Sequence, residues 1–572
     1  MTKVLRPARL LLPSALMLAL SAPALASTAV SPEAPSGYGA YLAGQEALRD
    51  LSTSDAARYL HDATTVEWTN PAVAQQAFVA YLANGDIDRA ATMANHLLDM
   101  QPKNGLAKLV LAASELKDRR YRAVEKLLDG ISTDDIAGIT GSILRAWAFI
   151  GDGKPDEAFA ALDKVGKGGL EDFLIFHRAL MEDISGDSAD ALTLAAKAYQ
   201  SSPTAPRMVE AYARILGNAG KFDEALDVVN KFDAQALGDP IIDRVKIALA
   251  AHQRPGLFSP NVQSGAAELF HGIAVALARD GNNDLAVSLL QIGLYLDPHD
   301  DVIPLLIGQL LDNADQHASA NAFYANIPAA SPMHLLAATR IAQNYDAMGN
   351  RPEAIRQLTS LAAANPTDLN TLTALGDMLR ADKQYDEAAK YYTQAIDADP
   401  ATRPGDWVLY YERGIAYERG KHWDKAEPDF LKALDLNPDQ PQVLNYLGYT
   451  WVDRGENLDK ALAMIQKSVK ATQTDGFIID SLGWAYFKLG RFPEAVKTLE
   501  TAVQLKPNDP QINDHLGDAY WRAGRKLEAH FQWNVAASLD TDGTLKAELA
   551  KKQTFGLDTD TIAAAASATT TQ

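Results

Sequence analysis

Residues 476–507 read GFIIDSLGWAYFKLGRFPEAVKTLETAVQLKP, and residues 510–540 read PQINDHLGDAYWRAGRKLEAHFQWNVAASLD. The two stretches follow one pattern with an offset of 34 residues, so that Leu482 corresponds to Leu516 and Ala495 corresponds to Ala529. An internal repeat of this length is typical of a stacked array of supersecondary units. The rest of the chain is therefore expected to contain further copies of the same unit.

An alanine marks the same position in fourteen units. These alanines are Ala56, Ala90, Ala123, Ala158, Ala191, Ala225, Ala286, Ala320, Ala354, Ala388, Ala426, Ala461, Ala495 and Ala529. Neighbours are 33 to 38 residues apart, except for 61 residues between Ala225 and Ala286. Many units have a glycine before this alanine and a proline after it, which suit a helix end and a break between helices. Each unit is therefore predicted to be two helices joined by a tight turn, with the small alanine at their crossing.

This pattern resembles the tetratricopeptide repeat. The resemblance rests on the Leu-Gly-x-x-Tyr sets from Leu482 to Tyr486 and from Leu516 to Tyr520, together with the spaced alanines, and it covers residues 37–542. It implies an all-α fold, a right-handed α-solenoid of about 14 helix-turn-helix units. The tandem segments VLNYLGYTWVDRG, DSLGWAYFKLG and NDHLGDAYWRAGR also look like a family of exported alphaproteobacterial tetratricopeptide proteins. Members of that family are described as repeat proteins without a known catalytic activity.

The composition narrows the classes of function. The chain has 572 residues, a net charge of -20 and no cysteine. The negative charge argues against nucleic acid or an anionic membrane surface as the main partner, because both are bound through basic patches. Without cysteine there is no disulfide, thiolate metal site or cysteine nucleophile. The sequence also lacks the usual metal-binding, phosphate-binding and nucleophile motifs, so it predicts a protein that is not an enzyme and needs no cofactor or metal.

The N-terminus has the features of a secretory signal peptide. Three basic residues precede an apolar run that ends in the cleavage motif Ala-Leu-Ala at residues 24–26. The alternative, a retained membrane anchor, is disfavoured because Pro13 and Pro23 interrupt the run and leave it short of a spanning helix. The mature protein is therefore expected in the periplasm, and association with the outer membrane stays open.

The repeats divide the chain into six parts. A signal peptide covers residues 1–26, a linker 27–36, an N-terminal arm of repeats 37–239, an irregular segment or hinge 240–266, a C-terminal arm 267–543, and a capping helix with a disordered tail 544–572. The irregular segment accounts for the long interval between two alanines, because a Gly/Pro-rich loop is expected there in place of one helix. Two interpretations remain open for it, a degenerate repeat that only packs and a hinge between the arms.

The resemblance also predicts a partner-binding surface. In the tetratricopeptide family the first helix of each unit lines a concave groove, and the positions that face it fall here on a set of polar and aromatic residues. They are Asn445, Tyr449, Asp480, Trp484, Phe487, Asp514, Asp518 and Trp521. Amide and carboxylate groups can hydrogen-bond an extended peptide, and aromatic rings supply contact area. Because the charged members are acidic, a protein or peptide partner with basic or amide-rich segments is expected. The alternative for the aromatic residues is a role in packing alone.

These inferences combine into one expected function. The chain is predicted to be a non-enzymatic scaffold or adaptor of the bacterial periplasm that binds a partner segment in its groove, in envelope assembly or trafficking. Two alternatives stay open. One is a tetratricopeptide component of an exopolysaccharide export or secretion system, and the other is a structural spacer without a groove ligand.

Overall fold

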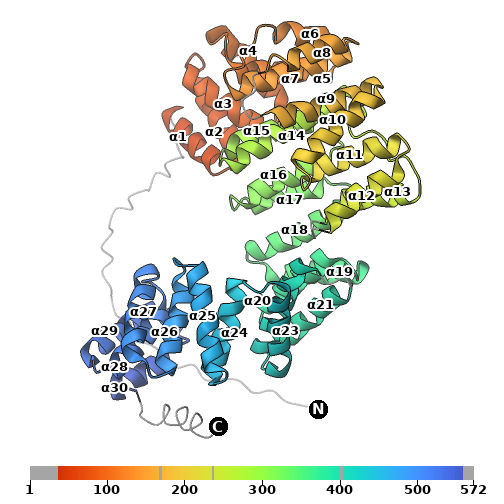
Figure 1. Cartoon of the computed structure of the whole chain (residues 1–572). Coiled ribbons are helices and arrows are strands. Elements are labelled where there is room, and N and C mark those ends of the chain that lie inside the picture. Colours follow the sequence, from red (N-terminus) through yellow and green to blue (C-terminus); the bar gives the residue numbers. More distant parts are fainter. Residues whose placement is uncertain (1–36, 166–169, 235–237, 399–402, 558–572) are drawn as a thin grey trace, which may run out of the picture.

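The computed structural model describes residues 37–165, 170–234, 238–398 and 403–557. The predicted signal peptide, the linker and the tail after residue 557 lie outside these residues. In the described part the fold is all α-helical, with 30 α-helices, one short 3-10 segment at Pro404–Asp406 and no strand. The prediction of an all-α solenoid is confirmed (Figure 1).

Twenty-eight of these helices form fourteen consecutive pairs. The first six pairs are α1 Gly37–Arg49 with α2 Thr53–Val66, α3 Pro71–Ala83 with α4 Ile87–Met100, α5 Gly105–Lys117 with α6 Tyr121–Leu127, α7 Ile136–Gly151 with α8 Pro155–Leu162, α9 Glu171–Ser185 with α10 Ser188–Ser201, and α11 Pro206–Asn218 with α12 Phe222–Asp233. The other eight pairs are α14 Val262–Arg279 with α15 Asn283–Leu296, α16 Val302–Asp312 with α17 His317–Ala325, α18 His334–Ala347 with α19 Arg351–Ala364, α20 Leu369–Ala381 with α21 Tyr385–Ala398, α22 Trp407–Arg419 with α23 Trp423–Leu436, α24 Pro441–Arg454 with α25 Leu458–Ala471, α26 Gly476–Lys488 with α27 Phe492–Leu505, and α28 Pro510–Arg522 with α29 Lys526–Leu539. Helices α13 Pro240–Ala250 and α30 Lys546–Phe555 have no such partner.

Small residues sit where the two helices of a pair cross. Thirteen of the fourteen marker alanines are completely inaccessible to solvent. The exception is Ala123, which is exposed because the neighbouring Val124 takes the buried place in α6. The glycine of the Leu-Gly motif also allows the two helices to approach closely, since a Cβ at Gly483 would lie 2.5 Å from the side chain of Leu499 on the paired helix.

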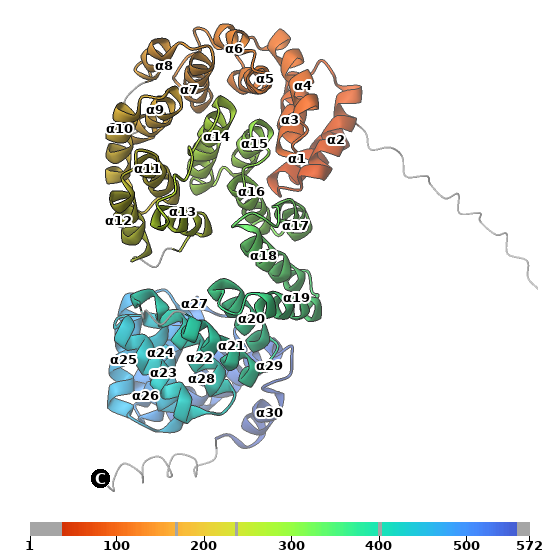
Figure 2. The same cartoon turned by 90° about the vertical axis from the view of Figure 1, so that its right-hand side faces the viewer.

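The first half of the chain curves around two of its own helices. Pairs α1–α12 and helix α13 form an arc, and α14 and α15 lie inside that arc (Figures 1 and 2). Helix α14 packs against α7 and α9, and α15 packs against α3 and α5. Thirteen of the 18 residues of α14 are buried, as expected for a helix with neighbours on all sides. One hydrophobic core accordingly runs from Ala47 to Ala337.

Helix α14 fits the inside of the arc through glycines and a glutamine. A Cβ at Gly265 would lie 2.2 Å from the ring of Trp147, so only glycine allows this close approach. Gln263 of α14 donates a hydrogen bond to the carbonyl of Leu116, near the C-terminus of α5. Gln291 of α15 donates in the same way to a carbonyl at the end of α3. Both carbonyls lie in the last turn of their helices, where the i+4 N–H of the helix is absent; the carbonyl of Leu116 also accepts a hydrogen bond from the backbone N–H of Arg119.

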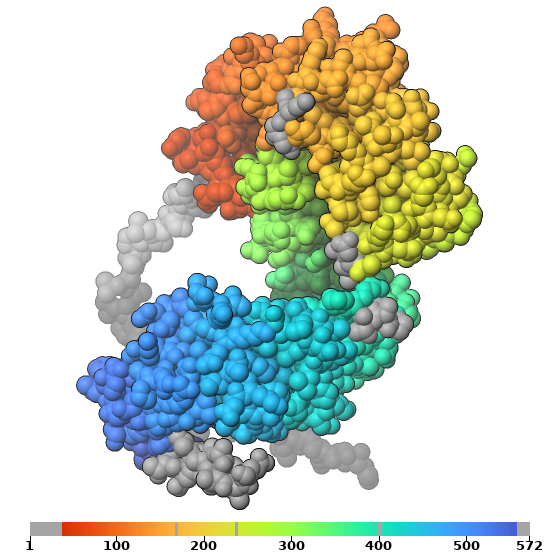
Figure 3. Space-filling model, viewed as in Figure 1, coloured from red at the N-terminus to blue at the C-terminus, as the bar shows by residue number. Residues whose placement is uncertain are grey.

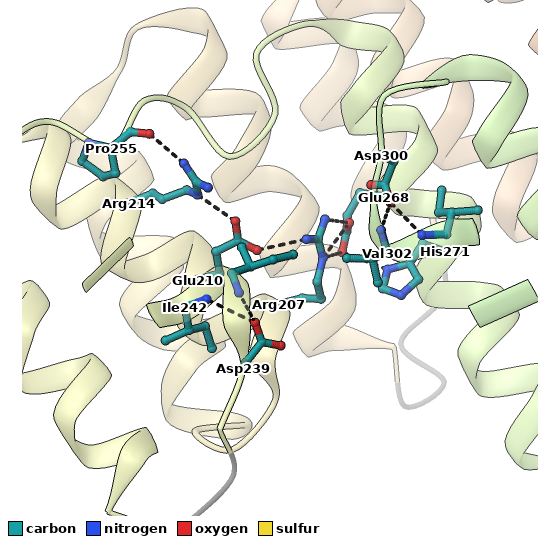
Figure 4. A network of polar contacts seen from close by, with 12 residues as sticks. Arg207, Glu210, Arg214, Asp239, Ile242, Pro255, Glu268, His271, Asp300 and Val302 are labelled. Carbon is teal, nitrogen blue, oxygen red and sulfur yellow. Dashed lines mark hydrogen bonds and ion pairs between the residues drawn. The ribbon is translucent and has the colours of Figure 1, made fainter. Parts of the chain in front are cut away.

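The segment expected to be irregular contains a helix, a loop and the start of α14. Because α14 begins at Val262, the predicted boundary between 266 and 267 falls inside this helix. Arg207 of α11 donates hydrogen bonds to Glu268 of α14 across this region (Figure 4). Burial alone would raise the pKa of Glu268, but the guanidinium of Arg207 holds that pKa far below its usual range. The charged pair therefore links α11 to α14, and a hinge role for 240–266 stays a prediction.

Helices α16–α19 lead from the arc into the second half of the molecule, α20–α30, which forms a separate mass in the space-filling view (Figure 3). In this half the substantial contacts join helices of one pair, neighbouring pairs, and consecutive first helices such as α24, α26 and α28. We call the first helices α20, α22, α24, α26 and α28 the C-terminal row. The row carries all of the residues predicted to bind a partner.

Candidate functional site

The eight predicted site residues lie on three consecutive helices of the C-terminal row. Two come from α24, three from α26 and three from α28. Helices α26 and α28 each begin after an aspartate, Asp475 or Asp509, whose side chain accepts hydrogen bonds from the first turn. This N-cap fixes the start of the helix and therefore the rotation of its side chains. The spacing of the repeats thus brings the predicted residues to adjacent helices, as the sequence indicated.

Their exposure differs from that of an open groove. Asp480, Phe487, Asp514 and Asp518 are buried, with exposed fractions between 2 and 6%. The other four residues are half-buried. The carboxylates that were expected to meet a partner therefore meet other groups of the same chain, and their partners show why they are buried.

Asp480 of α26 pairs with His515 of α28. Both carboxylate oxygens lie 3.0 Å from Nδ1 of the imidazole. Burial alone would lower the pKa of His515, but the Asp480 carboxylate raises the pKa above its usual value. The indole of Trp484 stacks on this imidazole, with ring centroids 4.1 Å apart and planes inclined by 16°. Trp484 is thus held between His515 on one side and Phe487 on the other.

Asp514 and Asp518 of α28 share the ammonium group of Lys552, which belongs to the terminal helix α30. Lys552 Nζ lies 2.8 Å from Asp514 Oδ2 and 2.9 Å from Asp518 Oδ2. Asp518 also accepts a hydrogen bond from Nε1 of Trp533. Burial and the neighbouring Asp514 raise the pKa of Asp518 to about 6, because one cation compensates two buried carboxylates only in part.

Polar pairs of this kind recur along the row and continue it at both ends. They are Thr339 with Thr371, Arg380 with Glu412, Glu418 with Tyr446, Asp480 with His515, and Asp514 with Lys552. Each pair joins two consecutive helices of the series α18, α20, α22, α24, α26, α28 and α30. His515 and Lys552 were not predicted as site residues from the sequence. The signal that could have found them is a cation 35 or 38 residues after an aspartate, which is about one repeat length.

The step from α24 to α26 is different. Lys488 and Asp453 form an ion pair near the ends of the two helices. Deeper in the row, Oδ1 of Asn445 on α24 and Nε1 of Trp484 on α26 are buried and have no hydrogen-bond partner among the described residues. Tyr449 lies half-buried on α24, and burial raises the pKa of its hydroxyl. This step therefore keeps an unused acceptor and an unused donor.

Trp521, the last predicted site residue, is covered by the end of α30. A Cβ at Gly556 would lie 1.9 Å from the indole ring. The ring also lies 5.4 Å from that of Trp533, centroid to centroid, and the ammonium group of Lys526 lies 4.8 Å from its centroid. Trp521 is thus a packing surface for the terminal helix in this structure, and its role toward a partner stays a prediction.

The described residues contain no group of three or more His, Cys, Asp or Glu side chains arranged to hold a metal ion. No helix in the same part of the chain combines the length and the apolar character needed to cross a membrane. What the C-terminal row offers is hydrogen bonding and contact between side chains.

Comparison with known families decides the kind of repeat. Family models described as Tetratricopeptide repeat match residues 76–123, 339–401 and 407–440, and one described as TPR repeat matches residues 483–524. The chain is a tetratricopeptide repeat protein. The matched segments lie in both halves of the solenoid, and the last one contains the Leu-Gly-x-x-Tyr set from Leu516 to Tyr520. A tetratricopeptide fold is generally a non-catalytic scaffold for protein interactions.

Relatives of this tetratricopeptide protein match only parts of it. A TPR repeat-containing protein of Pseudomonas aeruginosa is 32% identical over 110 residues, which is 19% of this chain and 19% of the relative. The BBSome complex member BBS4 of Bos taurus is 26% identical over 151 residues, 26% of this chain and 28% of the relative. The chain thus covers 19% and 28% of the length of these two proteins.

Solved structures resemble it at low identity. The Cut9–Hcn1 hetero-tetramer of the APC/C is 14% identical, with a TM-score of 0.40, over 91% of this chain and 96% of that one. A MamA structure from MSR-1 is 26% identical, with a TM-score of 0.25, over 30% of this chain and 94% of that one. The family assignment rests on the helix pairs and on the matching repeat models.

Proposed function

We propose that this protein is an exported, periplasmic scaffold that binds a segment of a partner protein on its C-terminal row, at the step between α24 and α26, in envelope assembly or trafficking. The proposal is supported by three features: the repeat family, the signal-like N-terminus and the two unused polar atoms of that step. The location of the binding site is inferred from the two unused polar atoms.

The unused atoms match the chemistry of a peptide. Asn445 Oδ1 accepts hydrogen bonds and Trp484 Nε1 donates one. Each peptide unit has one N–H donor and one C=O acceptor, so a partner backbone or an amide side chain can satisfy both atoms once the side chains that cover them move aside. A buried polar atom without a partner costs about 1–3 kcal/mol. A ligand that pairs with both atoms would recover much of that free energy.

Observations on two other parts of the solenoid also favour the α24–α26 step as the binding site. The inside of the N-terminal arc is filled by α14 and α15 of the same chain. Along the C-terminal row, the acidic residues are engaged by His515 and Lys552. At the α24–α26 step, by contrast, two buried polar atoms have no hydrogen-bond partner among the described residues. Its neighbouring rings, those of Tyr449 and Trp484, add contact area of the kind that dominates binding hot spots.

A double variant tests the site. Trp484→Phe keeps a ring that can stack on His515 but removes the indole donor, and Asn445→Ala removes the acceptor. Proteins captured from an envelope extract by the wild-type chain should be reduced at least tenfold with the double variant, as expected for about 1.4 kcal/mol or more of lost binding free energy. Trp68→Phe, at a tryptophan of the N-terminal arc, is the matched control and should capture the same proteins as wild type.

Circular dichroism of the double variant confirms that the solenoid is intact. If the folded double variant captures every protein that the control captures, binding at this step is refuted and the spacer alternative is favoured. The cellular location is tested separately. Residues 1–36 are fused to a reporter that becomes active only after export, and an inactive fusion would refute the periplasmic part of the proposal.

A further inference from the structure

The terminal helix α30 occupies one end of the C-terminal row. It lies beside α29 (Figure 1) and places Lys552 on α28, so it stands where the first helix of another repeat would begin. Only Leu549 and Lys552 of its ten residues are buried. The first helix α28, by comparison, buries nine of its 13 residues.

The contact of α30 with α28 has the features of a specific recognition site. Lys552 is 6% exposed and its ammonium group reaches two aspartates of α28 at once. Leu549, one helical turn earlier, is buried in the cluster that includes Trp533. Gly556, four residues after the lysine, allows the chain to pass against Trp521. The pattern Leu-x-x-Lys-x-x-x-Gly thus meets an apolar contact, an acidic pair and an aromatic ring.

Few interactions hold α30 on the solenoid. A helix of ten residues is marginally stable in water on its own, and α30 has few buried residues to hold it in place. Phe555 near its end is 79% exposed. The acidic pair, by contrast, requires a cation, because two adjacent buried carboxylates without one are strongly unfavourable. A cation from another helix can therefore take the place of Lys552 on α28.

We propose that α30 is an intramolecular ligand of the C-terminal row, and that a partner helix with a leucine followed by a lysine three residues later binds the same place on α28 by displacing it. This inference extends the proposed function, since it names a second contact for the partner and a control on it. Displacement replaces one Lys–Asp contact by another, so the carboxylates stay compensated throughout. The tethered α30 competes with any such partner, because a covalent tether gives an effective concentration of about millimolar.

The test uses the full chain and a peptide of known sequence. The probe is a fluorescein-labelled peptide of residues 544–557, TLKAELAKKQTFGL. In the Lys552→Glu chain, the new carboxylate faces Asp514 and Asp518 and should undock α30. Fluorescence anisotropy should show at least tenfold tighter peptide binding to this chain than to wild type. The Lys551→Glu chain, changed at the exposed neighbour, should bind the peptide as weakly as wild type.

A second peptide identifies the contact. The same peptide with Lys552→Met should bind the Lys552→Glu chain at least tenfold more weakly than the unmodified peptide. Equal binding of the two peptides, or equal binding by the Lys552→Glu and Lys551→Glu chains, would overturn the proposal. Circular dichroism must show that both chains keep wild-type helicity.

Hydrogen exchange of the unmodified chain gives an independent answer. If α30 opens on its own, its amides should exchange at least tenfold faster than those of α28, and equal protection of the two helices would overturn the proposal. No extract is used in these experiments. Peptide binding with failed capture in the envelope experiment would refute only the proposed function, whereas successful capture without peptide binding would refute only the role of α30.

Discussion

Acid should destabilise the N-terminal arc through a single histidine. His177 of α9 is fully buried among three aromatic rings, those of Trp147, Phe173 and Phe176. Trp147 donates a hydrogen bond from Nε1 to Nδ1 of the imidazole, 3.3 Å away. The imidazole must therefore be neutral, with its proton on Nε2. Protonation of Nδ1 would place two N–H donors opposite each other in an apolar site.

The size of the effect follows from the pKa. Burial lowers the pKa of His177 from its ordinary value of 6.5 to about 4. Because the folded-state pKa is the lower one, the stabilisation is complete above pH 6.5 and is lost as the pH falls toward 4. At about 1.36 kcal/mol per pH unit, the full loss is roughly 3 kcal/mol, and about 2 kcal/mol should be gone at pH 5.

The assay compares two variants at two pH values. His177→Gln keeps an acceptor for Trp147 and cannot titrate, and His299→Gln changes an exposed histidine as the control. The free energy of opening of α9, from hydrogen exchange, should fall between pH 7.5 and pH 5 by about 2 kcal/mol more in wild type and in the control than in His177→Gln. The other titrating groups are common to wild type and His177→Gln, so their contributions cancel in the difference between these two chains. An equal pH dependence of the three chains would refute the assignment to His177.

Three further perturbations test other parts of the solenoid. Gly265→Val should lower the free energy of unfolding of the arc by about 3 kcal/mol or more, measured by urea denaturation, because the new side chain collides with Trp147. Asp429→Asn should cost about 3 kcal/mol in the same measurement on the second half, since it breaks the two-pronged pair with Arg413 at 2.7 and 2.8 Å; an unchanged midpoint would contradict the buried pair. Asp183→Asn should stabilise α9 by about 1–2 kcal/mol at pH 8, after allowance for its partial exposure. Burial raises the pKa of Asp183 to about 6, so the protonated form stabilises the folded state below pH 3.8 and this contribution is lost as the pH rises through 6. The gain from the asparagine should therefore vanish near pH 4.

The positions of the helix pairs along the chain could be predicted from the sequence, because packing at each helix crossing restricts the residue that can stand there. A helix pair that crosses at an alanine tolerates no larger side chain, so the marker recurs wherever the crossing recurs. The single error, at Ala123, arises where a neighbouring valine fills the same space. A capping helix was expected within residues 544–572, and α30 spans Lys546–Phe555.

The position of α14 and α15 inside the arc could not be predicted in this way. Repeat spacing describes contacts between neighbouring units, whereas α15 packs against α3 and α5, which lie more than 160 residues earlier. The composition of α14 does contain a hint. Its run GAAELFHGIAVALA contains only two polar residues, Glu268 and His271, and such a composition is typical of a helix with neighbours on most sides.

The eight predicted site residues lie on three consecutive first helices, and their role toward a partner stays a prediction. The charge attributed to them needs a different explanation. The aspartates of the row were read as a surface for a basic partner because they follow the family's groove positions. In the structure each of them faces a cation that arrives from the next first helix, so the charge is already compensated within the solenoid. A position rule taken from one unit cannot detect this, because the compensating residue belongs to another unit.

This arrangement changes how a partner should be recognised. Compensated carboxylates attract a basic segment only if it can replace the internal cation, and such replacement is feasible where that cation comes from a short helix at the chain's end. His515 belongs to α28, which is held by nine buried residues, so its pair with Asp480 should persist in any complex. Lys552 belongs to α30, which has two. Charge selectivity is therefore expected at α28 alone, while the α24–α26 step should select for amide groups through Asn445 and Trp484.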